Sequence, residues 1–156
     1  MIEELSTKYD DAIMTVIKDI IDLKFEAGNI LQGDELEDLL DHYYQALIRG
    51  NIELLYRYGE LQGYVTWIRL PEIPKSRRFT YLDMDTESND GSILYIINCC
   101  VRDDIKHKIL WNLFHRLHIK NPHYEVMCWY DNNGELHKWE HTKHNSNKRI
   151  TEGLYV

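Results

Sequence analysis

The chain has 156 residues and a net charge of −8, with 44% hydrophobic and 12% aromatic side chains. This length and composition favour one globular domain over residues 1–156. The negative charge argues against a general binder of nucleic acid or anionic membranes, because phosphate surfaces are recognised by clustered Lys and Arg. The acidic start Met1–Leu5 lacks the positive region of a signal peptide, and no apolar run is long enough to span a bilayer. We therefore expect a cytoplasmic protein that makes no membrane contact.

Two amphipathic helices and a β-hairpin are predicted for the first seventy residues. Apolar residues recur at helical spacing in two stretches, of which the second ends at Gly50. Asp34 with Glu37 resembles a capping box at the start of that second helix. Two runs of β-forming residues follow, and the segment Gly59–Gly63 between them predicts a hairpin turn. The elements expected here are helices over 8–26 and 34–50 and strands over 52–58 and 64–70.

A central strand–helix–strand unit is the clearest pattern in the sequence. Ser92–Val101 is a near-continuous run of β-forming apolar residues, as expected of a strand buried on both faces. Asn121–Pro122 ends an amphipathic helix, and a second strand follows it. Such a βαβ unit predicts two parallel strands joined by a right-handed crossover. Its elements are expected as a strand over 92–101, a helix over 105–119 and a strand over 123–129.

Loops and further strands are predicted on either side of this unit. Residues 71–91 are expected to form a long loop, with room for a short strand over 79–82. The turn Asp131–Gly134 leads into an alternating stretch, Glu135–Thr142, which predicts another strand. Residues 150–156 are expected to add a last strand or an extended arm. The expected division is a helical N-terminal segment over 1–50, a hairpin over 51–70, a loop over 71–91, a central unit over 92–131 and C-terminal strands over 132–156.

Two segments resemble the GNAT superfamily of N-acetyltransferases. Tyr58–Val65 resembles that family's hairpin between its second and third strands, and Ile93–Trp129 resembles its strand, cofactor loop, helix and following strand. The resemblance implies an α+β or α/β fold with a mixed central sheet, two N-terminal helices, a hairpin, a central βαβ unit and a C-terminal hairpin. The tail Trp129–Trp139 is more similar to GNAT-like proteins of bacteriophages and to toxin-activating lysine acyltransferases. That similarity extends the expectation to a protein of bacteriophage origin.

The GNAT resemblance also implies where a cofactor would bind. In the family, the central strand pairs with the pantetheine arm of an acyl-CoA, and a glycine-containing loop meets the pyrophosphate. The corresponding cofactor contacts in this sequence are Cys100, Val101, Lys106, His107 and Lys108. Ile109 and Trp111 align with the two small positions of that loop, and Asp103 and Asp104 add negative charge beside it. Bulky side chains keep the loop backbone away from a polyphosphate, and negative side chains repel it. The sequence therefore indicates a degenerate acyl-CoA site. The alternative is that Ile109, Leu110, Trp111 and Leu113 only pack the helix onto the sheet.

Candidate catalytic groups lie at the end of the central strand. Cys99 and Cys100 stand where acyltransferases expose their catalytic centre, and His42 is the only early histidine able to approach them. Asn98 is an alternative polar group on the same strand. Residues 92–101 contain no carboxylate to act as the general base of an ordinary GNAT enzyme. The other interpretation is that the three cysteines of the chain are buried free thiols in a reducing compartment.

Histidine pairs and aromatic residues offer further candidates. One pair stands on the predicted helix, at positions 115 and 118, and another on the last strand, at positions 137 and 141. Neither pair is completed to a metal-ligand pattern, so we expect solvent-facing histidines and no metal. Tyr130 and Trp139 flank a turn, where exposed aromatic side chains would indicate a protein interface.

Two functions of different classes are compatible with these patterns. The favoured one is a non-catalytic interaction or structural protein with protein partners, such as a virion component, a member of an oligomer or an antagonist of a host defence. The alternative is an acyl-CoA-dependent N-acyltransferase that uses acetyl-CoA or another acyl-CoA and acts on an amine of a protein or small molecule. The sequence leaves open whether the chain is an enzyme, and it favours no cofactor.

Overall fold

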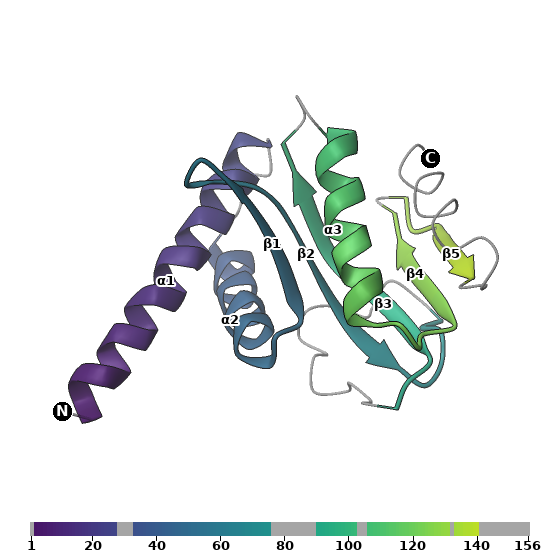
Figure 1. The fold of residues 1–156 in the computed structure, drawn as a ribbon, viewed down its shortest axis with the longest axis horizontal. Coiled ribbons are helices and arrows are strands. Elements are labelled where there is room, and N and C mark those ends of the chain that lie inside the picture. The colour runs from purple at the N-terminus through teal and green to yellow at the C-terminus, as the bar shows by residue number, and fades with distance from the viewer. Residues whose placement is uncertain (1, 28–32, 76–89, 103–105, 132, 141–156) are drawn as a thin grey trace.

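The computed structural model of the chain describes residues 2–27, 33–75, 90–102, 106–131 and 133–140. Within these ranges the chain forms an α+β fold with one mixed sheet, as the sequence predicts. The elements in chain order (Figure 1) are α1 (Ile2–Glu26), α2 (Gly33–Arg49), β1 (Ile52–Arg57), β2 (Glu60–Leu70), β3 (Ile93–Val101), α3 (Lys106–Lys120), β4 (Val126–Tyr130) and β5 (Leu136–Glu140). The strand expected over 79–82 and the strand or arm expected over 150–156 lie outside the described residues.

The strands lie side by side in the order of the sequence, β1-β2-β3-β4-β5. Neighbours are antiparallel except for β3 and β4, which are parallel and are joined through α3. The predicted βαβ unit is therefore confirmed. No helix among the described residues combines the length and the apolar character that crossing a membrane would require.

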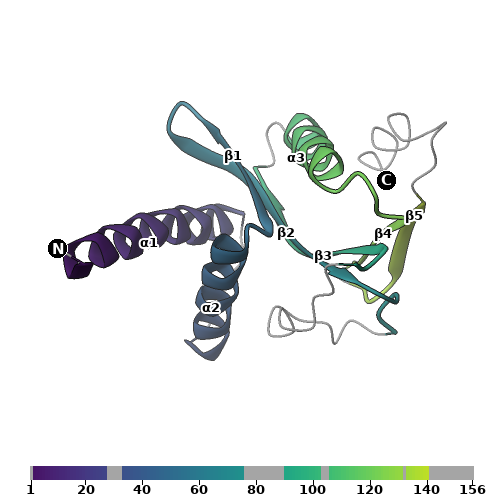
Figure 2. The ribbon, with the colours of Figure 1, turned by 60° about the horizontal axis from the view of Figure 1, so that its bottom comes forward.

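The helices cover both faces of the sheet (Figure 2). One core cluster joins α1 and α2 to the sheet and contains the fully buried Ile20 and Tyr43. The other lies between α3 and the opposite face of the sheet and contains the fully buried Leu94 and Leu113. This three-layer arrangement explains why β2 and β3 are apolar on both faces, because side chains from successive positions enter different cores.

Two boundaries can be compared directly with the sequence pattern. Helix α1 begins at Ile2 and not at Lys8, because the sequence between these residues contains neither Gly nor Pro to stop a helix. The end of α2 is as predicted: the helix stops at Arg49, and Gly50 adopts a positive φ of 74°.

The hairpin turn is shorter than the predicted Gly59–Gly63 segment. Strand β1 ends at Arg57 and β2 begins at Glu60, so only two residues connect them, and both have positive φ: Tyr58 at 54° and Gly59 at 75°. This conformation matches the right-handed twist of a two-residue hairpin. Gly63 lies inside β2, opposite Leu55, and its predicted place in the turn is wrong.

Candidate functional site

Strand β3 is longer than its pairing with β4. The two strands pair only over Ile93–Tyr95, opposite Val126–Cys128, whereas β3 continues to Val101 beside β2. Strand β4 instead pairs along its whole length with β5. Among the described residues, the side of Ile96–Val101 that faces away from β2 therefore has no neighbouring strand, and we refer to it as the open edge of β3. The backbone groups of such an edge can pair with another extended chain.

A β-bulge occurs at the start of this open edge. Along β2 the register passes directly from Trp67 to Thr66, but their partners on β3 are Ile96 and Asn98. Ile97 is therefore the extra residue. A bulge of this kind disrupts the ladder locally and redirects the neighbouring side chains. Here the Asn98 side chain lies on the α1 and α2 side of the sheet, where it contacts residues from α2 and β2.

Asn98 is the centre of a buried polar cluster. The hydroxyl of Tyr64 donates to Asn98 Oδ1, and the hydroxyl of Tyr43 lies 3.3 Å from the same oxygen and 2.6 Å from the Tyr64 hydroxyl. Both tyrosines are fully buried. Burial, with a contribution from the Tyr43 hydroxyl, raises the pKa of Tyr64 well above its ordinary value. The Tyr64 phenol is therefore held protonated, as a hydrogen-bond donor.

His42 enters the same cluster from α2. Its Nε2 lies 2.9 Å from Thr66 Oγ1, and that hydroxyl lies 3.4 Å from the carbonyl oxygen of Asn98, to which it donates. A threonine hydroxyl carries one hydrogen, so if that hydrogen goes to the carbonyl, Nε2 of His42 must be the donor in its own hydrogen bond. In this arrangement Nε2 cannot act as a general base, and the proton-accepting lone pair of the ring is on Nδ1, which is buried. The sequence pattern points to His42 and Asn98 but not to Tyr43, Tyr64 and Thr66, which have the spacing of ordinary core residues.

The cysteines divide into buried and exposed positions. Cys100 and Cys128 are buried, as predicted, and burial raises the pKa of Cys128 to about 11. The prediction of a buried thiol is wrong for Cys99, which is exposed after the bulge. Lys24 of α1 is only 8% exposed. Burial lowers its pKa, and its electrostatic interaction with Cys100 and Cys99 opposes that change.

The first turn of α3 holds three of the predicted cofactor contacts, Lys106, His107 and Lys108, whereas Cys100 and Val101 are buried at the end of β3. Lys108 is exposed, whereas the side chains of Lys106 and His107 and the residues Asp103 and Asp104 lie outside the described residues. Ile109 is buried against β2. A Cβ atom added to Gly63 would lie 2.6 Å from Ile109 Cγ2 and 2.8 Å from Val101 Cγ1. The helix therefore approaches β2 closely through Gly63, and the aligned small position is filled by a core side chain.

Trp111 does not pack onto the sheet, which corrects the prediction for this residue. It is 41% exposed, and its ring stacks on that of His115, with centroids 5.1 Å apart and an angle of 4° between the planes. Its position on α3 turns it away from the core that holds Ile109 and Leu113. At about 100° per residue, Trp111 lies on the opposite side of α3 from Ile109 and Leu113, so helical periodicity itself indicates its exposure.

The remaining histidine and aromatic candidates make local contacts. His118 Nδ1 lies 3.4 Å from the Tyr124 hydroxyl, and His137 Nε2 lies 2.8 Å from Asp131 Oδ2. Tyr130 is partly buried and donates to the Pro74 carbonyl oxygen. The second histidine of the last pair, at position 141, lies outside the described residues. Among the described residues, no group of three or more His, Cys, Asp or Glu side chains could hold a metal ion.

No protein-family model matches this chain, and no curated protein matches it. The candidate site therefore rests on the geometry of β3 and its surroundings.

Proposed function

We propose that this chain is a GNAT-like protein that works as an interaction or structural module and binds an extended segment of a protein partner along the open edge of β3. The observation that carries the proposal is the early end of β3–β4 pairing at Tyr95 and Cys128. Backbone N–H and C=O groups along Ile96–Val101 offer an extended peptide the same hydrogen bonds that a neighbouring strand would make. In this proposal the protein acts in the cytoplasm or, for a bacteriophage gene, in the virion.

The chemistry of the buried cluster supports binding over catalysis. A general base needs a group that accepts a proton near neutral pH. Tyr64 is held protonated, the contacts of Tyr43 with Tyr64 and of His42 Nε2 with Thr66 are hydrogen bonds within the cluster, and Nδ1 of His42 is buried away from solvent. Its described members include no carboxylate. Such a network stabilises the bulged strand and fixes the shape of the edge beside it.

The surroundings of α3 also favour a partner other than a nucleotide-bearing cofactor. The side chain of Ile109 fills the space above Gly63, where close backbone approach to a pyrophosphate would need a small residue. In the sequence, Asp103 and Asp104 stand three and two positions before Lys106, the first residue of this helix, and negative residues there oppose a polyphosphate.

The alternative is an acyl-CoA-dependent N-acyltransferase, and the bulge at Ile97 is the observation that favours it. Bulges occur next to active sites because they interrupt strand pairing and re-aim side chains. The amide groups of a pantetheine arm would fit the open edge as a peptide does. Cys100 and Val101 would then contact the arm, and Lys106, His107 and Lys108 would contact the phosphates. Acetyl-CoA or a longer acyl-CoA would supply the activated acyl group.

Calorimetry and thermal-shift titrations with acetyl-CoA, and then with a longer acyl-CoA, separate these two functions. We expect no saturable binding at millimolar ligand. Saturable stabilisation that disappears in Lys106→Glu would establish the acyltransferase alternative, because a ligand that binds only the folded state raises its stability.

A photoreactive maleimide on the exposed Cys99 tests the protein-binding proposal directly. In extracts of the source cells, this label should capture a defined partner, whereas the same label on a Lys18→Cys/Cys99→Ser variant, on α1, should not. The purified partner should then slow backbone hydrogen exchange over Ile96–Val101. Binding without slower exchange in this segment would show that the open edge is not the site.

A further inference from the structure

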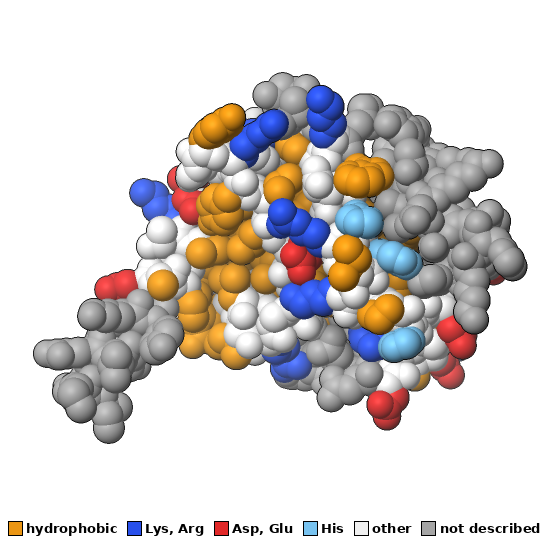
Figure 3. Space-filling view, in the orientation of Figure 1, with side chains coloured by type: hydrophobic (Ala, Val, Ile, Leu, Met, Phe, Trp, Pro, Cys, Tyr) orange, Lys and Arg blue, Asp and Glu red, His pale blue; other side chains and the backbone are white. Residues whose placement is uncertain are grey.

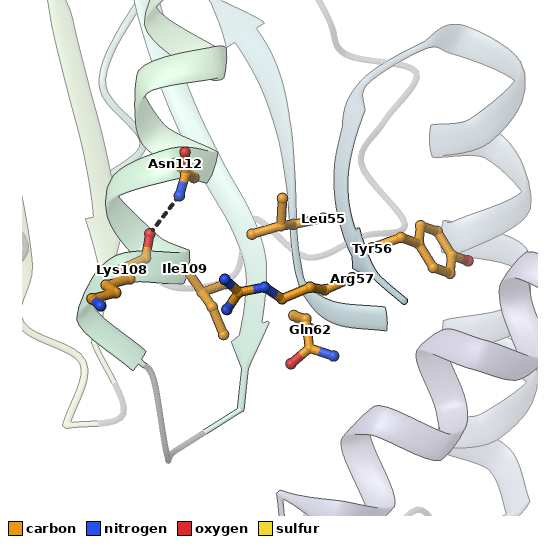
Figure 4. A pocket seen from close by; sticks show the side chains of 7 residues that line it. All are labelled: Leu55, Tyr56, Arg57, Gln62, Lys108, Ile109 and Asn112. Carbon is orange, nitrogen blue, oxygen red and sulfur yellow. Dashed lines mark hydrogen bonds between the residues drawn. The ribbon is translucent and has the colours of Figure 1, made fainter. Parts of the chain in front are cut away.

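A small pocket lies between the β1–β2 hairpin and the first half of α3 (Figure 4). Its volume is about 200 Å³. Leu55 and Ile109 provide apolar surface, and the complete lining is Leu55, Tyr56, Arg57, Gln62, Lys108, Ile109 and Asn112. The ring of Tyr56 points away from the pocket, and its hydroxyl donates to Asp19 of α1. None of these residues belongs to the open edge of β3, so the pocket is a separate feature of the molecule.

The polar groups of the pocket are cations and amides. Figure 4 shows Arg57 extending from β1 toward α3, so that its guanidinium lies beside Ile109, whereas the Lys108 side chain leaves α3 on the side away from Arg57. Gln62 is buried in the floor and donates through Nε2 to the Glu60 carbonyl oxygen. Asn112 donates through Nδ2 to the Lys108 carbonyl oxygen, 3.0 Å away. Each side-chain amide has two N–H groups, so each retains one for a ligand.

The charge of this pocket contrasts with that of the whole chain. The net charge of the chain is −8, yet the described lining contains two cations and no carboxylate. Figure 3 shows Lys and Arg side chains along the boundary between the hairpin and α3. Two of the cations on this boundary are engaged within the protein: Arg116 donates to the Leu54 carbonyl oxygen, and Lys120 pairs with Glu53.

Arg57 and Lys108 differ from those two cations. Within the described residues, neither side-chain cation has a hydrogen bond or an ion pair to the protein. A planar guanidinium with amide donors around it suits an oxyanion that accepts several hydrogen bonds, and an ammonium group adds a flexible point charge.

We propose that this pocket binds the phosphate group of a small phosphate monoester. The Arg57 guanidinium holds two phosphate oxygens, Lys108 adds positive charge at the rim, and the spare N–H groups of Gln62 and Asn112 complete the hydrogen bonds of the phosphate. The organic moiety of the ligand packs against Leu55 and Ile109. The site uses no residue of the open edge of β3, so it is independent of the peptide-binding function proposed above. It shares only Lys108 with the phosphate contacts of the acyltransferase alternative.

Calorimetric titration with phenyl phosphate, inorganic phosphate and phenol tests both parts of this proposal, the binding of the phosphate group and the packing of the organic moiety. We expect saturable binding of phenyl phosphate, weaker binding of inorganic phosphate and none of phenol. Arg57→Glu should weaken phenyl phosphate binding at least about tenfold, because it removes a bidentate charged contact and adds repulsion. Lys108→Glu should weaken it less, since Lys108 lies at the rim.

Lys18→Glu is the matched control, because Lys18 is an exposed lysine on α1 and its substitution makes the same change in net charge. The affinity of the Lys18→Glu variant for phenyl phosphate should equal that of the unmodified protein. The side-chain amide resonances of Gln62 and Asn112 should shift on titration in the folded protein, which also verifies that the variants fold. Equal affinity in Arg57→Glu, equal loss in Lys18→Glu, or equal binding of inorganic and phenyl phosphate would each overturn the proposal.

Discussion

Tyr64 shows how a polar side chain is accommodated in the core of this protein. Its ring is fully buried, and its hydroxyl donates to Asn98 and lies 2.6 Å from the hydroxyl of Tyr43. A buried polar group is tolerated only when its hydrogen bonds are made, because it has lost its contacts with water. The cluster around Asn98 satisfies this condition and links α2, β2 and β3 through side chains.

Removal of the Tyr64 hydroxyl should therefore be costly. Tyr64→Phe should lower the free energy of unfolding by about 1–3 kcal/mol, because it leaves buried partners without a donor. Tyr56→Phe is the matched control, since its exposed hydroxyl donates to Asp19, and it should cost less than about 1 kcal/mol. Urea denaturation followed by circular dichroism measures both values. Equal costs would contradict the structural role assigned to the cluster.

The hydrogen bonds of Asp131 predict how the stability of the folded protein depends on pH. The hydrogen bond from His137, followed by the backbone N–H groups of Glu135 and Asn133, lowers the pKa of Asp131 from its ordinary value of 3.8. Because the folded state favours the ionised carboxylate, this contribution to stability is complete above the ordinary value. It is lost as the pH falls through the lower, folded-state value.

Asp131→Asn should remove this component of the acid dependence. The urea midpoint of the unmodified protein should fall as the pH drops below about 4, and that of the variant should fall less over the same range. Asp90→Asn, at an exposed position, is the control and should behave like the unmodified protein. The prediction fails if the two variants show the same acid dependence.

At the scale of elements, the close approach of α3 to β2 depends on one glycine. Gly63 has no side chain, which lets Ile109 of α3 and Val101 of β3 meet above it. A Cβ atom there would also lie 3.2 Å from the Cys100 carbonyl oxygen. The position of the helix over the sheet, and with it the pocket beside Arg57, therefore depends on this contact.

Gly63→Ala should displace α3 and lower the free energy of unfolding by about 1–3 kcal/mol, the usual cost of overpacking. Ile109→Ala alone should cost about 2–5 kcal/mol through the cavity that it leaves. The double variant should cost less than the sum, because removal of Cγ2 relieves the closest clash. A double-mutant cycle by urea denaturation measures the coupling, and strict additivity would show that the two residues do not share this contact.

At the scale of the whole molecule, one sheet serves two hydrophobic cores. Ile20 belongs to the core under α1 and α2, and Leu113 to the core under α3 (Figure 2). Strands β2 and β3 contribute side chains to both, so loss of either core exposes the sheet that supports the other. This arrangement predicts cooperative unfolding.

Ile20→Ala and Leu113→Ala should each lower the free energy of unfolding by about 2–5 kcal/mol, because both side chains are fully buried. In each variant, unfolding curves from circular dichroism and from tryptophan fluorescence should coincide. Two separated transitions in either variant would show that the cores unfold independently.

The sequence alone determined the elements whose signal is local. Apolar periodicity predicts α1, α2 and α3, and continuous β-forming runs predict the strands of the βαβ unit. The parallel pairing of β3 and β4 follows from that order, because a helix must cross over between parallel strands. The GNAT resemblance, its cofactor and its partners remain expectations from the sequence.

Only the tertiary structure decided which side chains meet. Tyr43 and Asn98 are 55 positions apart, and Arg116 and Leu54 are 62 positions apart, so no local pattern relates them. The exposure of Cys99 and the packing role of Gly63 follow from the bulge in β3 and the placement of α3. The open edge of β3 likewise depends on where β4 leaves it for β5. Local periodicity determines which face of an element is apolar, whereas packing between distant segments determines what that face contacts.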